Sequence, residues 1–236
     1  MIPIGDDNSD RHLSPIVNYI LIAASILVFI LLQGMGSNLE FTYAFSTVPA
    51  EILTGDDIAT NGLQPTPIPV YGTLITSMFM HGGWAHLGGN MLFLWVFGDN
   101  IENRMGHLRY LGFYLLCGII ASLSHVFISG ASSANSLIPS LGASGAISGV
   151  MGGYMLLFPK RKVKVFMGRG IAEVPAFVAL GIWIVFQIIS GMGVLGGTEG
   201  GGGGVAYAAH VGGFIAGLLL VKLFDKGAKN STVLNT

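Results

Sequence analysis

The chain has 236 residues, of which 52% are hydrophobic and only 10% are charged, with a formal net charge of −1. A soluble domain carries roughly 25% charged residues, so this composition excludes an ordinary soluble protein and indicates an integral membrane protein. The single cysteine excludes an internal disulfide.

Six apolar runs follow one another along the chain. They are continuous rather than alternating, which predicts helices and not the strands of a barrel. Most approach the roughly 20 residues that cross a bilayer. The predicted fold is therefore an all-α membrane protein, a bundle of six transmembrane helices. The runs cover residues 16–32, 85–98 (extending to 103), 108–128, 141–158, 174–189 and 205–224.

The basic residues are segregated among the segments that join these runs. All eleven Lys and Arg lie in the N-terminal tail, the second loop, the fourth loop or the C-terminal tail. By the positive-inside rule, both termini are cytoplasmic. We expect one membrane domain over 1–236, with a cytoplasmic tail at 1–15, a long outer first loop at 33–84, a basic cytoplasmic loop at 159–173, a glycine-rich outer loop at 191–204 and a cytoplasmic tail at 225–236.

Polar residues stand near the start of the second, fourth and sixth predicted helices. They are His86 with Asn90, then Ser144, then His210. Polar side chains at membrane depth are costly and usually functional. All three helices enter from the outer face, so a rise of about 1.5 Å per residue places these residues at one depth, about 5 to 10 Å below the outer edge. A serine, a histidine and an amide that can meet suggest a nucleophile, a base and an oxyanion binder.

Glycines at four-residue spacing continue along the fourth and sixth helices from these residues. Small residues at i and i+4 remove side-chain bulk along one stripe, so two helix backbones can approach closely. A serine in such a stripe is usually a packing residue whose hydroxyl bonds the preceding turn. For Ser144, the shared depth and the glycine stripes together favour a catalytic role over a packing role. The stripes are Gly145, Gly149 and Gly153 on the fourth helix, and Gly213 and Gly217 on the sixth.

These motifs together resemble those of the rhomboid intramembrane serine proteases. The resemblance covers nearly the whole chain and implies that Ser144 is the nucleophile and His210 its general base. It also implies that His86 and Asn90 help the Ser144 backbone N–H to bind the oxyanion, and that a small residue precedes the cut. The matching motifs are His86-x-x-x-Asn90, Gly142-x-Ser144-Gly145 and Ala209-His210-x-Gly212-Gly213.

The chain departs from familiar members of that family in two places. Several relatives carry Trp-Arg in the first loop, whereas no basic residue lies between Arg11 and Arg104 here. Some carry an aromatic residue four positions after the serine, where it packs on the histidine, but here that position is Ser148. A structural hydrogen bond is the favoured role for Ser148, and a modest catalytic contribution is the alternative.

The residues predict a Ser-His dyad without an acid. Asp99 and Glu102 lie at the inner end of the second helix, most of a bilayer away from the serine, and a carboxylate at the reaction depth would be costly. No metal, nucleotide or other cofactor signature occurs, and no nucleic-acid partner is expected. Residues 191–204 would form a flexible cover over the site, with a plain linker as the alternative.

The expected substrates are single-span membrane proteins that unwind easily near the outer end of the span. A zinc protease would need His-Glu-x-x-His, and a soluble hydrolase Gly-x-Ser-x-Gly; neither occurs. The alternatives left open are a rhomboid-like protein that binds transmembrane helices without cutting them, and a small transporter. The six-helix form without targeting extensions is typical of a prokaryotic inner-membrane protein.

Overall fold

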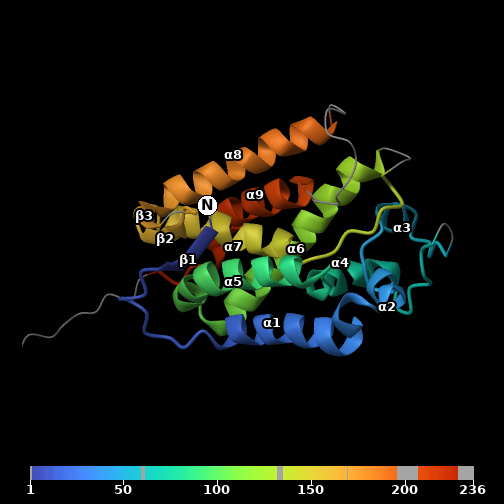
Figure 1. The fold of residues 1–236 in the computed structure, drawn as a ribbon, viewed down its shortest axis with the longest axis horizontal. Coiled ribbons are helices and arrows are strands. Elements are labelled where there is room, and N and C mark those ends of the chain that lie inside the picture. The colour runs from blue at the N-terminus through green and yellow to red at the C-terminus, as the bar shows by residue number, and fades with distance from the viewer. Residues whose placement is uncertain (1, 60–61, 132–134, 169, 196–206, 228–236) are drawn as a thin grey trace, which may run out of the picture.

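The computed structural model describes residues 2–59, 62–131, 135–168, 170–195 and 207–227. Its longer helices lie side by side along one direction, with α1 and α8 at opposite edges of the view in Figure 1 and α7 between them. These helices are α1 (Ile16–Leu27, continued by the π-helical η1, Val28–Leu32), α5 (Trp84–Met105), α6 (His107–Gly130), α7 (Ser144–Leu157), α8 (Ala176–Leu195) and α9 (Tyr207–Phe224).

The long segment between η1 and α5 is built of short helices. The amide of Gln33 ties its two ends together, because Gln33 Nε2 donates to the His81 carbonyl and the His81 N–H donates to Gln33 Oε1. Asn38 caps one of the helices by accepting from the Phe41 N–H. The elements are η2 (Gly34–Gly36), α2 (Leu39–Ala44), α3 (Pro49–Thr54), η3 (Val70–Gly72), α4 (Thr73–Thr76) and η4 (Ser77–Phe79).

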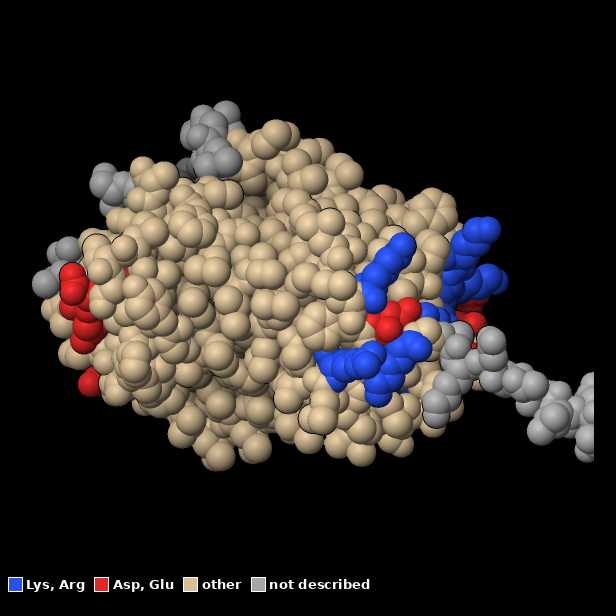
Figure 2. Space-filling model, turned by 180° about the vertical axis from the view of Figure 1, so that it is seen from behind, with Lys and Arg blue, Asp and Glu red and all other residues tan. Residues whose placement is uncertain are grey.

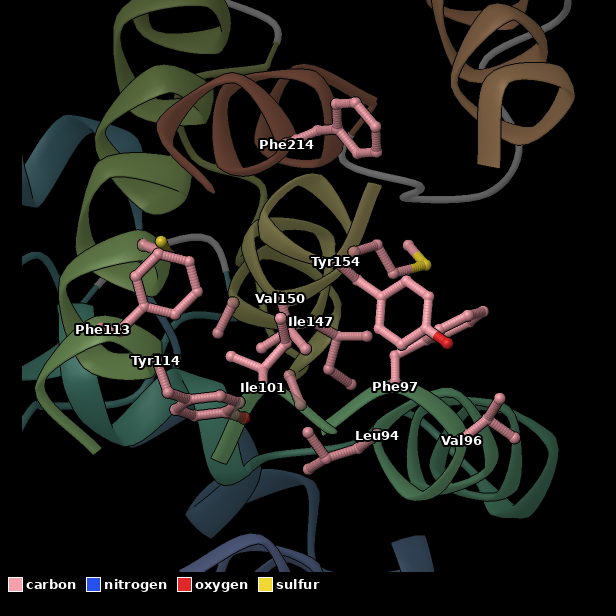
Figure 3. Close-up of a cluster of buried hydrophobic side chains, with 14 of the residues drawn as sticks. Leu94, Val96, Phe97, Ile101, Phe113, Tyr114, Ile147, Val150, Tyr154 and Phe214 are labelled. Carbon is pink, nitrogen blue, oxygen red and sulfur yellow. The ribbon is translucent and has the colours of Figure 1, made fainter. Parts of the chain in front are cut away.

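Helix α7 forms the centre of the molecule. Every residue from Gly145 to Tyr154 is buried, which is possible only because neighbouring helices cover all sides of this helix. Figure 3 shows apolar side chains of α5, α6 and α9 converging on it. Dense packing of this kind stabilises the fold through many small dispersion contacts. The labelled side chains are Leu94, Val96, Phe97, Ile101, Phe113, Tyr114, Ile147, Val150, Tyr154 and Phe214.

Helices α7 and α9 approach each other at the predicted glycine stripes. A Cβ placed on Gly217 would lie 2.8 Å from the Gly149 Cα, and one on Gly213 would lie 3.1 Å from the Gly145 carbonyl carbon. These neighbours are backbone atoms, so only glycine allows this separation. Gly153, the last glycine of the fourth-helix stripe, instead faces side chains of α6 and α9.

The prediction of an all-α protein is wrong in one part of the chain. A three-stranded antiparallel sheet in the order β1-β2-β3 joins the N-terminus to the segment between α7 and α8, where only a tail and a basic loop were expected. In β2, Val163 and Val165 are buried and the alternating residues Lys162 and Lys164 are exposed, which is the pattern of a half-buried strand. The strands are β1 (Ile2–Asp6), β2 (Lys162–Phe166) and β3 (Ile171–Pro175).

A polar network holds the N-terminal segment against the C-terminal part of α5. The Asp6 carboxylate accepts from the Tyr154 hydroxyl at 2.5 Å and from Asn100 Nδ2 at 2.7 Å. Arg11 pairs with Asp99 at 2.8 Å. Burial is the main reason that the pKa of Asp6 is raised to about 7, with the negative charge of Asp99 adding to the rise and the two hydrogen bonds opposing it.

The helix bounds differ from the apolar runs at several ends, and the starts of α7 and α8 differ for a local reason. Helix α7 begins at Ser144 rather than at residue 141, because Gly142 has a φ of +120°. Helix α8 begins at Ala176, since residues 174–175 belong to β3, and it continues to Leu195. The first part of the predicted glycine-rich cover, 191–195, is therefore helical, and its remainder, 196–204, lies outside the described residues.

Two helices of the described chain, α6 and α9, are both long enough and apolar enough to cross a membrane. The apolar stretches 16–32, 144–157 and 176–192 are shorter. On the face in Figure 2, Lys and Arg side chains gather at one end together with some acidic side chains, uncharged residues form the middle, and only Asp and Glu carry charge at the other end. The basic residues that are segregated along the sequence thus gather in space on this face.

Candidate active site

Ser144 is the first residue of α7, and a glycine turn places it there. The Gly142 N–H donates to the Ser77 carbonyl at 2.9 Å, and its φ of +120° is one that residues with a Cβ rarely adopt. The chain then enters α7 directly. As a first-turn residue, Ser144 has no acceptor for its backbone N–H within the helix.

His210 lies in the first turn of α9 and faces Ser144. Its Nε2 is 2.8 Å from Ser144 Oγ, within the range over which a general base takes a hydroxyl proton. The glycine contacts between α7 and α9 lie next to this pair, because Gly145 packs against Gly213. Residues 66 positions apart are therefore joined at the same ends of two closely packed helices.

The other side of the His210 ring is held by α8. Gln187 Oε1 lies 2.7 Å from His210 Nδ1, and the Trp183 ring lies 5.9 Å from the imidazole at an interplanar angle of 40°. Sequence reasoning missed both residues. The only signal in the sequence is the amide of Gln187 inside an otherwise apolar run. An isolated amide does not indicate which residue of a neighbouring helix it contacts.

Asn90 and His86 lie on α5 across the cavity from this pair. Asn90 is 8% exposed, and its Nδ2 is buried with no hydrogen-bond partner among the described residues. A Cβ on Gly142 would lie 2.8 Å from the His86 ring and 3.5 Å from Asn90 Nδ2, so both side chains stand beside the turn that precedes Ser144. A buried donor without an acceptor costs about 1–3 kcal/mol. Such a donor is suited to a negative oxygen that forms only during a reaction.

These side chains share one cavity of about 240 Å³. Its walls come from the N-terminal parts of α5 and α7, the first turn of α9 and the middle of α8. The lining residues are Ala85, His86, Gly89, Asn90, Phe93, Ser144, Ile147, Met151, Trp183, Gln187 and His210.

His81 and Ser148 do not line this cavity. His81 is fully buried, with its ring stacked edge-on against His86 at 5.3 Å. Ser148 is buried and donates to the Ser144 carbonyl at 2.6 Å, the back-bond of a helical serine. The Ser148 hydroxyl therefore supports the first turn of α7 and makes no contact with the imidazole.

The acidic residues of α5 are engaged at the opposite end of the helix. Asp99 pairs with Arg11, and Glu102 accepts from the N–H groups of Val17 and Asn18. Among the described residues, no group of three or more His, Cys, Asp and Glu side chains could hold a metal ion. The cavity therefore contains a serine and histidines, with an amide rather than a carboxylate beside His210.

Comparison with known proteins identifies the family. The model of the rhomboid domain matches residues 70–226. The chain belongs to the rhomboid family. That family consists of membrane proteins, so the apolar helices of this rhomboid chain are those of a membrane domain.

Named relatives come from bacteria and from organelles. The "Rhomboid protease GluP" of Bacillus subtilis is 32% identical over 192 residues, which cover 79% of this chain and 34% of the relative. The "Rhomboid protein 1, mitochondrial" of Saccharomyces cerevisiae is 35% identical over 147 residues, covering 62% and 40% of the two chains. The "Rhomboid-like protein 11, chloroplastic" of Arabidopsis thaliana is 30% identical over 162 residues, covering 67% and 54%. The matched part is thus 34% to 54% of the length of these relatives.

The matched rhomboid region contains every residue of the cavity. It leaves out α1 and β1, which precede it. Strand β1 therefore lies outside the region that the rhomboid model matches, whereas the α5 residues to which it is bonded lie inside it.

Proposed function

We propose that this rhomboid chain is an intramembrane serine endopeptidase. In this proposal Ser144 is the nucleophile and His210 is the general base. The observation that carries the proposal is the 2.8 Å distance between His210 Nε2 and Ser144 Oγ at the wall of a cavity. The printed name of the Bacillus relative, a rhomboid protease, agrees with it.

The reaction would proceed through an acyl-enzyme. Ser144 Oγ attacks the peptide carbonyl as its proton moves to His210 Nε2, and a tetrahedral oxyanion forms. The intermediate collapses when the C–N bond breaks and the protonated His210 gives its proton to the leaving amine. A water then enters and attacks the ester carbonyl as it loses a proton to Nε2. The bond to Ser144 Oγ breaks as His210 gives this proton to Oγ, which releases the carboxylic acid and restores the free Ser144 and the neutral base.

The oxyanion would receive hydrogen bonds from α7 and α5. The donors proposed are the Ser144 backbone N–H, which has no intrahelical acceptor, and Asn90 Nδ2, with His86 beside them. A donor already fixed in a buried site needs no reorganisation during the reaction. One such donor is worth about 3 kcal/mol, or two to three powers of ten in kcat.

The same proposal includes a topology. The six long helices would cross the membrane with both termini in the cytoplasm, because the basic side chains gather at the end of the molecule that carries the sheet. The active site would then lie near the outer surface, at the starts of α5, α7 and α9, where water can reach it. We place the protein in a prokaryotic plasma membrane as a multi-pass protein.

Substrates would be single-span membrane proteins that reach the cavity from the side. A second cavity of about 440 Å³ lies between α5, α8 and the sheet and shares Phe93, Trp183 and Gln187 with the first. A peptide bond inside an intact helix is wrapped by its neighbours, so the span must unwind before Ser144 can attack. Glycine or polar residues near the outer end of the span should therefore favour cleavage, as should a small residue just before the cut.

A fluorophosphonate probe and a cleavage assay test the function together. The purified protein in detergent should be labelled by the probe and should cleave a single-span substrate with Gly-Gly near its outer end. Ser144→Ala and His210→Ala should lose both activities while remaining folded. Asn90→Ala should cleave about 10²- to 10³-fold more slowly. If the probe labelled the protein but no single-span substrate were cleaved, the reactive serine would stand and the proposed substrates would be wrong. Normal cleavage by Ser144→Ala would refute the serine mechanism.

A further inference from the structure

Gln187 is an unusual residue on α8. This helix presents mostly apolar side chains to its surroundings, with Phe186 62% and Ile189 59% exposed. Among the residues of α8 whose side chains the structure describes, Gln187 is the polar one that is buried, at 8% exposure. It lines the active-site cavity. A buried amide is costly unless it is paired, so its partner indicates its role.

That partner is the ring nitrogen of His210 that does not face Ser144. Gln187 Oε1 lies 2.7 Å from Nδ1, while Nε2 lies 2.8 Å from Ser144 Oγ. An amide oxygen accepts hydrogen bonds and cannot donate them. The contact therefore requires the proton on Nδ1, which leaves the lone pair of Nε2 directed at the serine hydroxyl. This is the tautomer that a general base must have.

Trp183 holds the same ring one helical turn earlier on α8. Its ring centroid is 5.9 Å from that of His210. Residues at i and i+4 lie on one helix face, so Trp183 and Gln187 contact the imidazole as a pair. Ser148 of α7 cannot do this, because its hydroxyl bonds the Ser144 carbonyl.

We propose that Gln187 is a positioning residue for His210, with its amide oxygen fixing the tautomer and the orientation of the imidazole. The proposal rests on the proposed function and adds to Ser144 and His210 a third residue, the uncharged Gln187. It also makes the base depend on the position of α8. If α8 moved away from α9, Nδ1 would lose its acceptor, and Nε2 would no longer be held toward Ser144.

The size of the effect follows from the chemistry of the pair. In a Ser-His-Asp triad, the wrong tautomer costs about 10⁴-fold in kcat. Gln187 carries no charge to stabilise an imidazolium, so its loss should cost less, about tenfold to a hundredfold in kcat. KM should change little, because the amide orients His210 and does not hold the span.

Three substitutions test this role. Gln187→Leu keeps the volume and removes the acceptor, so kcat should fall while thermal stability changes little. Gln187→Glu restores an acceptor and should recover most of the rate. A carboxylate there would favour the protonated imidazole, so the acidic limb of the pH–rate profile should move to higher pH. Gln64→Leu makes the matched change in the segment between α3 and η3, which does not line the cavity, and should behave as wild type.

Labelling of Ser144 by a fluorophosphonate separates base orientation from substrate entry, since the small probe needs no helix to pass α8. Gln187→Leu should be labelled more slowly, and the ¹⁵N signals of the His210 ring, assigned against His210→Ala, should lose the single Nδ1–H tautomer. Wild-type labelling and an unchanged tautomer in Gln187→Leu would overturn the proposal. Equal labelling of wild type and Ser144→Ala would instead overturn the proposed function.

Discussion

Gly217→Ala tests whether the close approach of α7 and α9 sets the distance between Ser144 and His210. A Cβ at residue 217 would lie 2.7 Å from the carbonyl carbon and 2.8 Å from the Cα of Gly149. These are backbone atoms that cannot rotate away. Because carbon atoms in contact stay about 3.5–4.0 Å apart, the two helices would have to separate by roughly 1 Å at this point.

This separation affects both stability and rate. Overpacking costs about 1–3 kcal/mol, and the gain of about 0.5–1 kcal/mol for replacing a helical glycine offsets only part of it. Residue 217 is two turns from His210, on the order of 10 Å along α9, so the displacement reaches the imidazole. The 2.8 Å distance from Nε2 to Oγ would then exceed the hydrogen-bond range of about 2.7–3.2 Å. A misplacement of 1 Å can cost about 10²-fold in rate.

Two measurements report these effects separately. The labelling rate of Ser144 by a fluorophosphonate reports the geometry of the site, and Tm in detergent micelles reports stability. Gly217→Ala should label about 10²-fold more slowly and should have a lower Tm. Gly88→Ala is the matched control, because a Cβ at this exposed position of α5 meets nothing within 4 Å. It should keep the wild-type rate and gain up to about 1 kcal/mol.

A wild-type labelling rate in Gly217→Ala would refute the reasoning, since α7 and α9 would then not set the catalytic distance. Slow labelling of both variants would refute it as well, because the effect would not depend on the helix contact.

Other perturbations probe different parts of the molecule. Ser148→Ala removes only the bond to the Ser144 carbonyl, so urea or thermal unfolding should show a loss of about 0.5–1.5 kcal/mol and labelling should stay within about tenfold of wild type. Arg104→Leu breaks the two-bond pair with Asp225 and should cost about 1–3 kcal/mol in the same measurement. The raised pKa of Asp6, about 7, means that its contribution to stability is complete below the unfolded value of about 3.9 and is lost as pH rises through 7. Asp6→Asn should flatten the change in Tm between pH 5 and pH 8, and an unchanged slope would assign the pH dependence to another group.

The six long helices were predictable because their apolar runs are long, and each of these six overlaps the run that predicted it. The side chains that meet at the cavity were predicted to meet from their depth, which depends only on their distance from a helix start. Both inferences need counting along the chain and no knowledge of how a helix is rotated. The predicted helix bounds were wrong where the local backbone conformation, and not the apolar composition, decides where a helix begins. Gly142 is an example, because its positive φ delays the start of α7.

Gln187 could not have been found in this way. Its role depends on the rotation of α8 about its own axis and on which helix α8 packs against, and an apolar run with low amphipathicity reveals neither. The sheet was not predicted because the lysines of a short basic segment indicate a cytoplasmic loop as well as the exposed face of a strand. Val163 and Val165 already alternate with these lysines, as the residues of a half-buried strand do.

The direction of the helices connects the charge distribution to the proposed chemistry. Helices α5, α7 and α9 all begin at the cavity, so the positive ends of their dipoles and their free N–H groups point toward the position where the oxyanion would form. Two of them carry a basic residue in the last turn, Arg104 on α5 and Lys222 on α9, which complements the negative end. A parallel arrangement of three helices therefore favours cations at one end and an anion at the other. The same feature that places the basic residues on the proposed cytoplasmic side makes the opposite end suitable for stabilising negative charge on a substrate carbonyl.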